Sequence, residues 1–205
     1  MKFRTGVLAG CVLAAVSGQA SSALINFEGE IEHHNDVVST YFTLDEDATD
    51  VRVWTDSFQS GTNFDPITAL WNADTGELID ENDDDDTVNP DTQTYYDSGF
   101  SLSELSAGDY LFTVATYDNF ALGDNLDDGF SFDDEDPIPL EEWDQPANDV
   151  DMGPYWSVWL DGVDRATNPD DPDDDDSASV PEPASVLLLL GGLLGLRARG
   201  VMRSS

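Results

Sequence analysis

The chain has 205 residues, with 44 acidic residues against 7 basic ones and a formal net charge of −37. This length suits one ordinary domain with flanking segments, and the charge excludes nucleic acid as a partner because phosphate backbones would repel such a surface. The chain is nevertheless 40% hydrophobic and 10% aromatic, with five tryptophans, which is more than a disordered acidic tail carries. We therefore expect a folded domain.

Residues 1–23 have the layout of a secretory signal peptide. Lys2 and Arg4 precede an apolar run over residues 6–16, and small residues follow it. A lipoprotein signal is the alternative, because residues 8–11 have the small-residue pattern that precedes a lipid-modified cysteine. Cleavage by a signal peptidase after residue 23 would leave a mature chain without cysteine, so disulfides would not stabilise it.

Residues 24–165 carry strand patterns and no convincing helical period. Eight short alternating or apolar runs are separated by turn-forming clusters of Asp, Asn, Gly and Pro. The runs cover Ile25–Ile31, Val38–Leu44, Val51–Thr55, Ile67–Asn72, Glu77–Asp80, Tyr95–Leu102, Tyr110–Thr116 and Tyr155–Val163. About eight strands in this length predict an all-β fold, an antiparallel β-sandwich or jelly roll. In the seventh run, period-two alternation places Tyr110, Phe112 and Val114 on the core face.

The last run separates two sets of aromatic side chains. Trp156, Val158 and Leu160 share one face of the strand, and Tyr155 and Trp159 share the other. If the first set faces the core, Tyr155 and Trp159 present flat rings to a sugar, as in many carbohydrate-binding sandwiches. The alternative is that loops cover both faces of this strand.

Several short motifs carry a resemblance to known domains. They are Asn35-Asp36-Val37, Phe64-Asp65-Pro66-Ile67, Asn82-Asp83-Asp84 and Leu105-Ser106-Ala107-Gly108-Asp109-Tyr110. Together they resemble bacterial pre-peptidase C-terminal domains, which are small jelly-roll sandwiches, often secreted and often calcium-binding. Two further motifs, Tyr117-Asp118-Asn119-Phe120 and Trp156-Ser157-Val158-Trp159, are similar to the ectodomains of a group of PEP-CTERM proteins. The resemblance covers most of residues 27–164 and implies a secreted jelly roll.

Aspartates outnumber glutamates three to one and cluster between the predicted strands. Short carboxylates in turns can surround Ca²⁺ with several oxygens, whereas softer metals prefer Cys or His. We therefore expect a Ca²⁺ site in the loops of the sandwich, with the ligands Asp65, Asn82, Asp83, Asp84 and Asp118. The alternative is that the acidic surface is an adaptation to salt.

An EF-hand is a poorer explanation of the same aspartates. Asp80, Asn82 and Asp84 have the alternating spacing of an EF-hand loop, and Asp91 stands at its twelfth position. The sixth position, however, is Asp85 instead of the required glycine, and no helical pattern flanks the loop.

Catalytic signatures are weak in this sequence. His33 and His34 are the only histidines, and neither a G-x-S-x-G elbow nor an H-E-x-x-H motif occurs. We expect the histidine pair to be a solvated strand edge rather than a metal site. A glycosidase needs only two carboxylates, so a polysaccharide hydrolase remains an alternative to the non-catalytic protein that we expect.

Residues 166–179 are expected to be an acidic linker. The part Ala166–Ser177 contains two prolines and no apolar side chain larger than alanine. Such a composition favours an extended chain whose charges repel one another.

Residues 180–205 combine three features. Pro181-Glu182-Pro183 precedes an apolar stretch over residues 184–196, and a basic tail with three arginines follows. This arrangement resembles a PEP-CTERM sorting signal. The 13 apolar-stretch residues are fewer than the ~20 that an independent transmembrane helix needs, which suits a short helix in a transient span. The arginines would hold the tail on the cytoplasmic side.

The resemblance to PEP-CTERM proteins implies cleavage near the Pro-Glu-Pro motif by an exosortase, a membrane protease of Gram-negative bacteria that make exopolysaccharide. The alternative is an ordinary C-terminal membrane anchor. In either case residues 24 to about 180 would lie outside the cytoplasm.

The sequence thus predicts an exported, non-catalytic protein of the cell surface or biofilm matrix. Its expected partners are signal peptidase, an exosortase-type protease, the inner membrane transiently, and the exopolysaccharide or surface matrix. Ca²⁺ is the expected cofactor, which would neutralise loop aspartates and bridge the acidic surface to anionic exopolysaccharide. A carbohydrate-binding module and, third, a polysaccharide hydrolase are the alternatives.

Overall fold

All eight predicted runs form β-strands. The computed structural model describes residues 24–145, 152–167 and 178–179, so the expected signal peptide and sorting segment lie outside the described residues. The predicted strands are β1 (Ile25–Glu30), β2 (Val37–Leu44), β3 (Val51–Thr55), β4 (Pro66–Asn72), β5 (Leu78–Asn82), β6 (Gly99–Leu102), β7 (Gly108–Thr116) and β8 (Tyr155–Asp161). β6 begins four residues later than predicted, because residues 95–98 form a turn and the approach to the strand.

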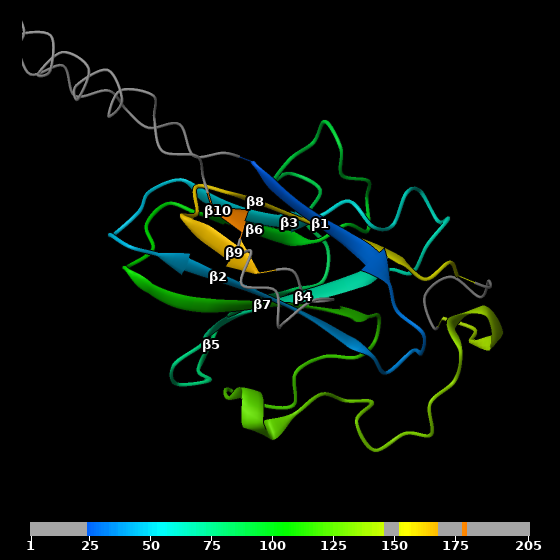
Figure 1. The fold of residues 1–205 in the computed structure, drawn as a ribbon. Helices are drawn as coiled ribbons and strands as arrows, with labels where there is room; N and C mark the ends of the chain where they lie inside the picture. Colours follow the sequence, from blue (N-terminus) through cyan, green and yellow to red (C-terminus); the bar gives the residue numbers. More distant parts are fainter. Residues whose placement is uncertain (1–23, 146–151, 168–177, 180–205) are drawn as a thin grey trace, which may run out of the picture. The chain divides into compact units, whose positions relative to one another are not determined.

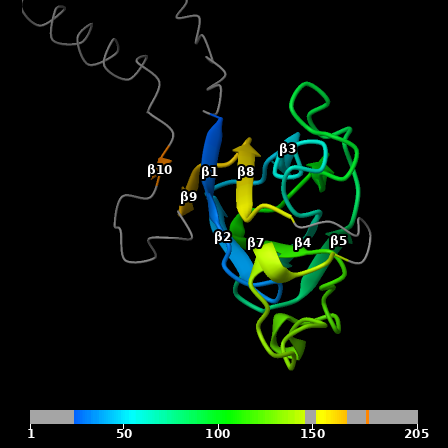
Figure 2. The same cartoon turned by 90° about the vertical axis from the view of Figure 1, so that its right-hand side faces the viewer.

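The strands form two antiparallel sheets, which Figures 1 and 2 show as two layers. One sheet has the order β1-β8-β3-β6, and the other has the order β10-β9-β2-β7-β4-β5. The pairing of the first eight strands is nested: β1 pairs with β8, β2 with β7, β3 with β6, and β4 with β5. The all-β antiparallel prediction is therefore confirmed.

The main core lies between the inner faces of the two sheets. Val53 and Phe112 are fully buried in it, and Phe100 meets Phe112 edge-on with ring centroids 6.2 Å apart. The predicted core face of β7 is confirmed, since Tyr110, Phe112 and Val114 all belong to this cluster. In β8, whose core face the sequence left open, Trp156, Val158 and Leu160 face this cluster.

A second apolar cluster covers the outer face of the six-stranded sheet. Residues 117–145, here called the covering segment, run along this face, from green to yellow in Figure 1. The segment contains the short 3-10 helices η1 (Leu126–Asp128) and η2 (Leu140–Glu142). Phe130 packs edge-on against Trp71, and Trp71 Nε1 donates a hydrogen bond to Thr113 Oγ1 at 3.0 Å. Both faces of the central strands are therefore buried.

His34 anchors the covering segment to the turn before β2, and the expectation that both histidines are solvated is wrong for this residue. Its side chain is fully buried between Phe132 and Trp143, with ring centroids 5.2 and 5.3 Å away. Its Nδ1 accepts a hydrogen bond from the Ile138 N–H, and its Nε2 lies 3.1 Å from Glu135 Oε2. Because both ring nitrogens contact groups of the covering segment, His34 has a structural role in packing this segment.

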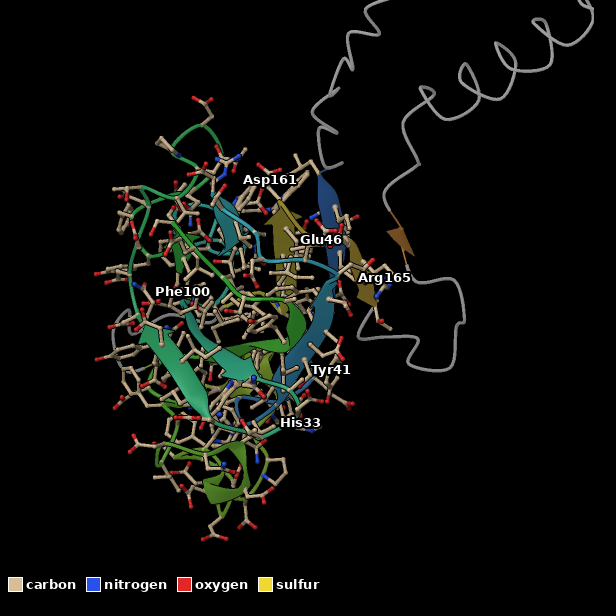
Figure 3. The ribbon with its side chains drawn as sticks, turned by 90° about the vertical axis from the view of Figure 1, so that its left-hand side faces the viewer. His33, Tyr41, Glu46, Phe100, Asp161 and Arg165 are labelled. Atoms are coloured by element: carbon tan, nitrogen blue, oxygen red, sulfur yellow. The ribbon has the colours of Figure 1, made fainter. Side chains whose placement is uncertain are left out.

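Two short strands extend the six-stranded sheet beyond the predicted ones. β9 (Arg165–Thr167) pairs with β2, and β10 (Ala178–Ser179) pairs with β9. Arg165 of β9 lies opposite Thr43 of β2, and Figure 3 labels Arg165 on β9 and Tyr41 further along β2. Arg165 also donates two hydrogen bonds of 2.8 Å to the Asp45 carboxylate, and these hold the pKa of Asp45 below its usual value. β9 thus begins at the last residue of the expected domain and continues into the expected linker.

Among the described residues, no helix is long and apolar enough to cross a membrane. The apolar stretch over residues 184–196 lies outside them.

Replacement of a core ring should destabilise the sandwich strongly. Because Phe112 has no exposed surface, Phe112→Ala leaves a cavity and should lower the free energy of unfolding by about 3–5 kcal/mol. Tyr41 is 50% exposed on the outer face of the six-stranded sheet, so Tyr41→Ala should change the free energy of unfolding by only about 0.5 kcal/mol. Urea unfolding of both variants measures the difference, and equal effects would contradict the assigned core.

Candidate metal centre

The strand register brings three chain segments together at one end of the six-stranded sheet. Pro66, the first residue of β4, pairs with Thr116, the last residue of β7. Asn82, the last residue of β5, pairs with Thr68 of β4. The residues just before β4, just after β5 and just after β7 therefore meet at this end of the sheet. Asp65 directly precedes β4, Asp83 directly follows β5, and Asp118 is the second residue after β7.

Asp65, Asp83 and Asp84, here called the acidic cluster, converge at this point. One carboxylate oxygen from each residue lies within 4.8 Å of those of the other two. Asp65 is only 2% exposed, whereas Asp84 is exposed to solvent. The buried oxygens Asp65 Oδ1 and Asp83 Oδ1 have no hydrogen-bond partner among the described residues. The acidic cluster thus has a buried base and an open side.

The described arginines do not neutralise the acidic cluster. Arg52 pairs with Asp161, and Arg165 pairs with Asp45. The chain's single lysine is Lys2, outside the described residues. Burying unpaired carboxylates is costly, so such groups either take up protons or bind a cation.

The pKa values of the acidic cluster reflect the cost of burying these unpaired carboxylates. Burial raises the pKa of the Asp65 carboxyl to about 8, and the charges of Asp84 and Asp83 add to the rise. Partial desolvation at the inner side of Asp84 also raises its pKa to about 6, with a further contribution from the charge of Asp83. The pKa of Asp83 is raised by burial and by the charge of Asp118. A bound cation would reverse these shifts, because it stabilises the ionised forms.

The five ligands predicted from sequence have different positions. Asp65, Asp83 and Asp84 form the acidic cluster, and Asp118 stands close enough to Asp83 to raise its pKa. Asp118 is exposed. The Asn82 side-chain oxygen instead accepts a hydrogen bond of 2.9 Å from the Ser98 hydroxyl. Asp80 and Asn82 belong to β5, so this segment has the conformation of a strand instead of an EF-hand loop.

Two residues that support the acidic cluster were not singled out from the sequence. Gln145 Oε1 accepts a hydrogen bond from the Asp65 N–H at 3.1 Å, and its buried Nε2 has no partner among the described residues. Gln145 is 80 residues from Asp65, and no local motif marks such a distant partner.

The second residue, Asp97, is fully buried and connects two loops. Its Oδ1 accepts hydrogen bonds from the Phe58 N–H and the Thr55 hydroxyl, and its Oδ2 accepts two from Thr94. Its backbone carbonyl accepts the Asp85 N–H at 2.9 Å. Asp97 therefore fixes the loop that carries Asp83 and Asp84. The Thr-x-x-Asp spacing of Thr94 and Asp97 is the local signal that would have indicated this turn.

Comparison of the chain with protein-family models and with curated proteins finds no match.

The cation-free protein should lose stability as the pH rises from about 4 to about 8. In that interval the folded state keeps the Asp65 proton, because the pKa is raised to about 8, while the unfolded chain releases it near pH ~3.9. The stabilisation that the Asp65 proton gives the folded state is therefore complete below pH ~4 and is lost as the pH rises through the folded-state pKa. Asp65→Asn should flatten this dependence, measured by thermal unfolding in EDTA between pH 5 and 8.5.

Asp134→Asn is the matched control, since Asp134 is exposed and outside the acidic cluster. It removes the same charge and should leave the pH dependence as it is in the unchanged chain. If the melting temperature falls with pH equally in the unchanged chain, in Asp65→Asn and in Asp134→Asn, the role assigned to Asp65 is contradicted.

Proposed function

We propose that the chain is an exported, non-catalytic module of the cell surface or biofilm matrix, with a jelly-roll fold stabilised by Ca²⁺. The nested pairing of β1 with β8, β2 with β7, β3 with β6 and β4 with β5 supports the jelly roll, in which two Greek keys form the two sheets. The observation that carries the proposal is the acidic cluster, with the unpartnered Oδ1 of the buried Asp65 at its base.

The donors of the acidic cluster suit Ca²⁺ among biological cations. They are carboxylate oxygens, which hard cations prefer, and the described part of the chain contains no cysteine. Oxygens on opposite sides of Ca²⁺ stand about 5 Å apart, because each Ca–O distance is about 2.3–2.6 Å. The mutual separations of up to 4.8 Å are compatible with such a sphere. Asp118, which is exposed beside Asp83, would be a further ligand after a small adjustment.

The open side of the acidic cluster suggests how the module would contact the matrix. Ca²⁺ takes about 6–8 oxygen ligands, more than the cluster supplies. Asp84 and Asp118 are exposed, so the remaining positions face solvent. A carboxylate of an anionic exopolysaccharide would fill them and be bridged to the acidic protein surface. Repulsion between the two polyanions would prevent this contact without the cation.

The export and sorting parts of the proposal depend on the ends of the chain, outside the described residues. Residues 1–23 would direct secretion through signal peptidase, and Pro181-Glu182-Pro183 with the apolar stretch would direct transient insertion in the inner membrane and processing by an exosortase-type protease. The resemblance to PEP-CTERM proteins supports this assignment.

Ca²⁺ should stabilise the protein specifically. Free Ca²⁺ at about 100 times its dissociation constant should add about 2.7 kcal/mol, which corresponds to a rise of about 5–10 °C in Tm. Thermal unfolding of the purified chain in EDTA, in millimolar Ca²⁺ and in NaCl of equal ionic strength measures this effect. Asp83→Asn should abolish the rise, and Asp134→Asn should retain it. An equal rise in NaCl alone would indicate salt adaptation and contradict the site.

A carbohydrate-binding module is the second candidate function, and the outer face of β8 favours it. Trp159 is partly exposed and stacks on Trp54, with ring centroids 6.2 Å apart and an interplanar angle of 9°. Tyr155 is also partly exposed, and its hydroxyl donates a hydrogen bond of 2.9 Å to Glu28. The Cα atoms of the two residues lie about 13 Å apart along the strand, at about 3.3 Å per residue over four residues.

Trp159→Ala separates this candidate from the matrix module. Under the second candidate, selective binding on a glycan array should fall at least tenfold, because the variant removes the flat apolar surface. Tyr41→Ala, which removes an exposed ring from the other sheet, should leave binding unchanged. Weak, unselective binding that requires Ca²⁺ and persists in both variants would favour the matrix module instead. Turnover of a polysaccharide would contradict both and indicate a hydrolase.

A further inference from the structure

A polar hollow lies beside the stacked tryptophans on the four-stranded sheet. The register pairs Trp54 with Trp159 and Arg52 with Asp161, so these two pairs occupy successive positions on the outer face. The Arg52 guanidinium carbon lies 5.2 Å from the Trp54 ring centroid, and the guanidinium also forms an ion pair with Asp161. Figure 3 labels Asp161 at the end of β8. An aromatic pair and a charged pair are thus adjacent.

The hollow, here called the Arg52 hollow, has a volume of about 470 Å³. It is lined by Asp50, Val51, Arg52, Ser101, Leu102, Ser103 and Asp161. The side chains of Arg52 and Asp161 are 39% and 27% exposed, so both reach its surface. Arg52 Nη1 also donates to the Val88 carbonyl at 3.3 Å, which fixes the guanidinium over Trp54. The guanidinium of Arg52 and the carboxylate of Asp161 are therefore held in place before any ligand binds.

We propose that the Arg52 hollow is a subsite for one residue of a neutral polysaccharide. This inference rests on the carbohydrate-binding candidate above and specifies its ligand. Sugar hydroxyl groups both donate and accept hydrogen bonds, and the hollow offers guanidinium donors, carboxylate acceptors and the hydroxyls of Ser101 and Ser103. Trp159 does not line the hollow, but it stands two positions before Asp161 on the same face of β8, and its partly exposed ring suits the apolar face of a neighbouring pyranose.

The charges around the Arg52 hollow favour an uncharged ligand. Arg52 is balanced by Asp161, and Asp50 adds a further carboxylate. Arg165, the other arginine of the described residues, lies in the six-stranded sheet and pairs with Asp45. An anionic sugar would meet net repulsion at this site, whereas a neutral sugar would not. The subsite therefore differs in ligand from the cation bridge proposed for the acidic cluster.

Affinity electrophoresis of the purified full chain in EDTA tests the proposal, because EDTA removes any bridging by Ca²⁺. The probes are four neutral polysaccharides, hydroxyethylcellulose, laminarin, galactomannan and dextran, with polygalacturonate as the anionic comparison. At least one neutral probe should retard the chain, and polygalacturonate should not. Ser103→Trp should weaken that retardation at least tenfold, because the new ring fills the hollow.

Leu122→Trp is the matched control, since Leu122 is 63% exposed on the covering segment, away from the four-stranded sheet. It should bind the neutral probe as the unchanged chain does. Ser101→Gln provides a smaller obstruction of the same hollow if the melting curve shows that Ser103→Trp has not folded, and it should weaken binding several-fold.

Three results would overturn the subsite: no retardation by any neutral probe, retardation by polygalacturonate alone, or undiminished binding by a folded variant with an obstructed hollow. If Trp159→Ala loses binding while Ser103→Trp keeps it, the carbohydrate-binding candidate stands and only the Arg52 hollow is excluded. The Ca²⁺-dependent melting curves report on the acidic cluster separately, since the two sites share no residue.

Discussion

Repulsion among carboxylates is the constraint on which the rest of this structure depends. All but one of the 44 acids fall between residues 24 and 180, where Arg52 and Arg165 are the only bases. The sandwich opposes this repulsion with two apolar clusters, one between the sheets and one beneath the covering segment. Most carboxylates remain at the surface, where water screens them. The acidic cluster is different because Asp65 is held in the interior by the start of β4.

Nested strand pairing explains why the acids meet where they do. The start of β4 and the ends of β5 and β7 are brought to one end of the six-stranded sheet by the registers of neighbouring strands. Asp97 then ties the loop after β5 to the end of β3 and the segment after it through two side-chain hydrogen bonds, from Thr55 and Phe58, while two more from Thr94 fix its own turn. A cation at the acidic cluster would connect the same segments a second time. Binding at this point would therefore oppose separation of the loops as well as local charge repulsion.

Two separate sites of the molecule suit different ligands under the proposals made above. The acidic cluster offers oxygen ligands without a balancing cation, which favours a divalent ion and, through it, an anionic polymer. The outer face of the four-stranded sheet offers a balanced Arg52–Asp161 pair beside aromatic rings, which favours an uncharged sugar. A matrix protein with both properties would hold two kinds of polysaccharide through separate chemistry.

The sequence by itself determined the eight strands, the inward-facing residues of β7 and the two side-chain sets of β8, because alternation along a strand is a local property. Sequence also placed Asp65, Asp83 and Asp84 at strand ends, but their convergence within 4.8 Å was decided by the tertiary structure. The burial of His34, the contact of Gln145 with Asp65 and the pairing of β9 with β2 were decided in the same way. Each joins residues far apart in the chain, so strand register and loop packing, which no local pattern encodes, set these contacts.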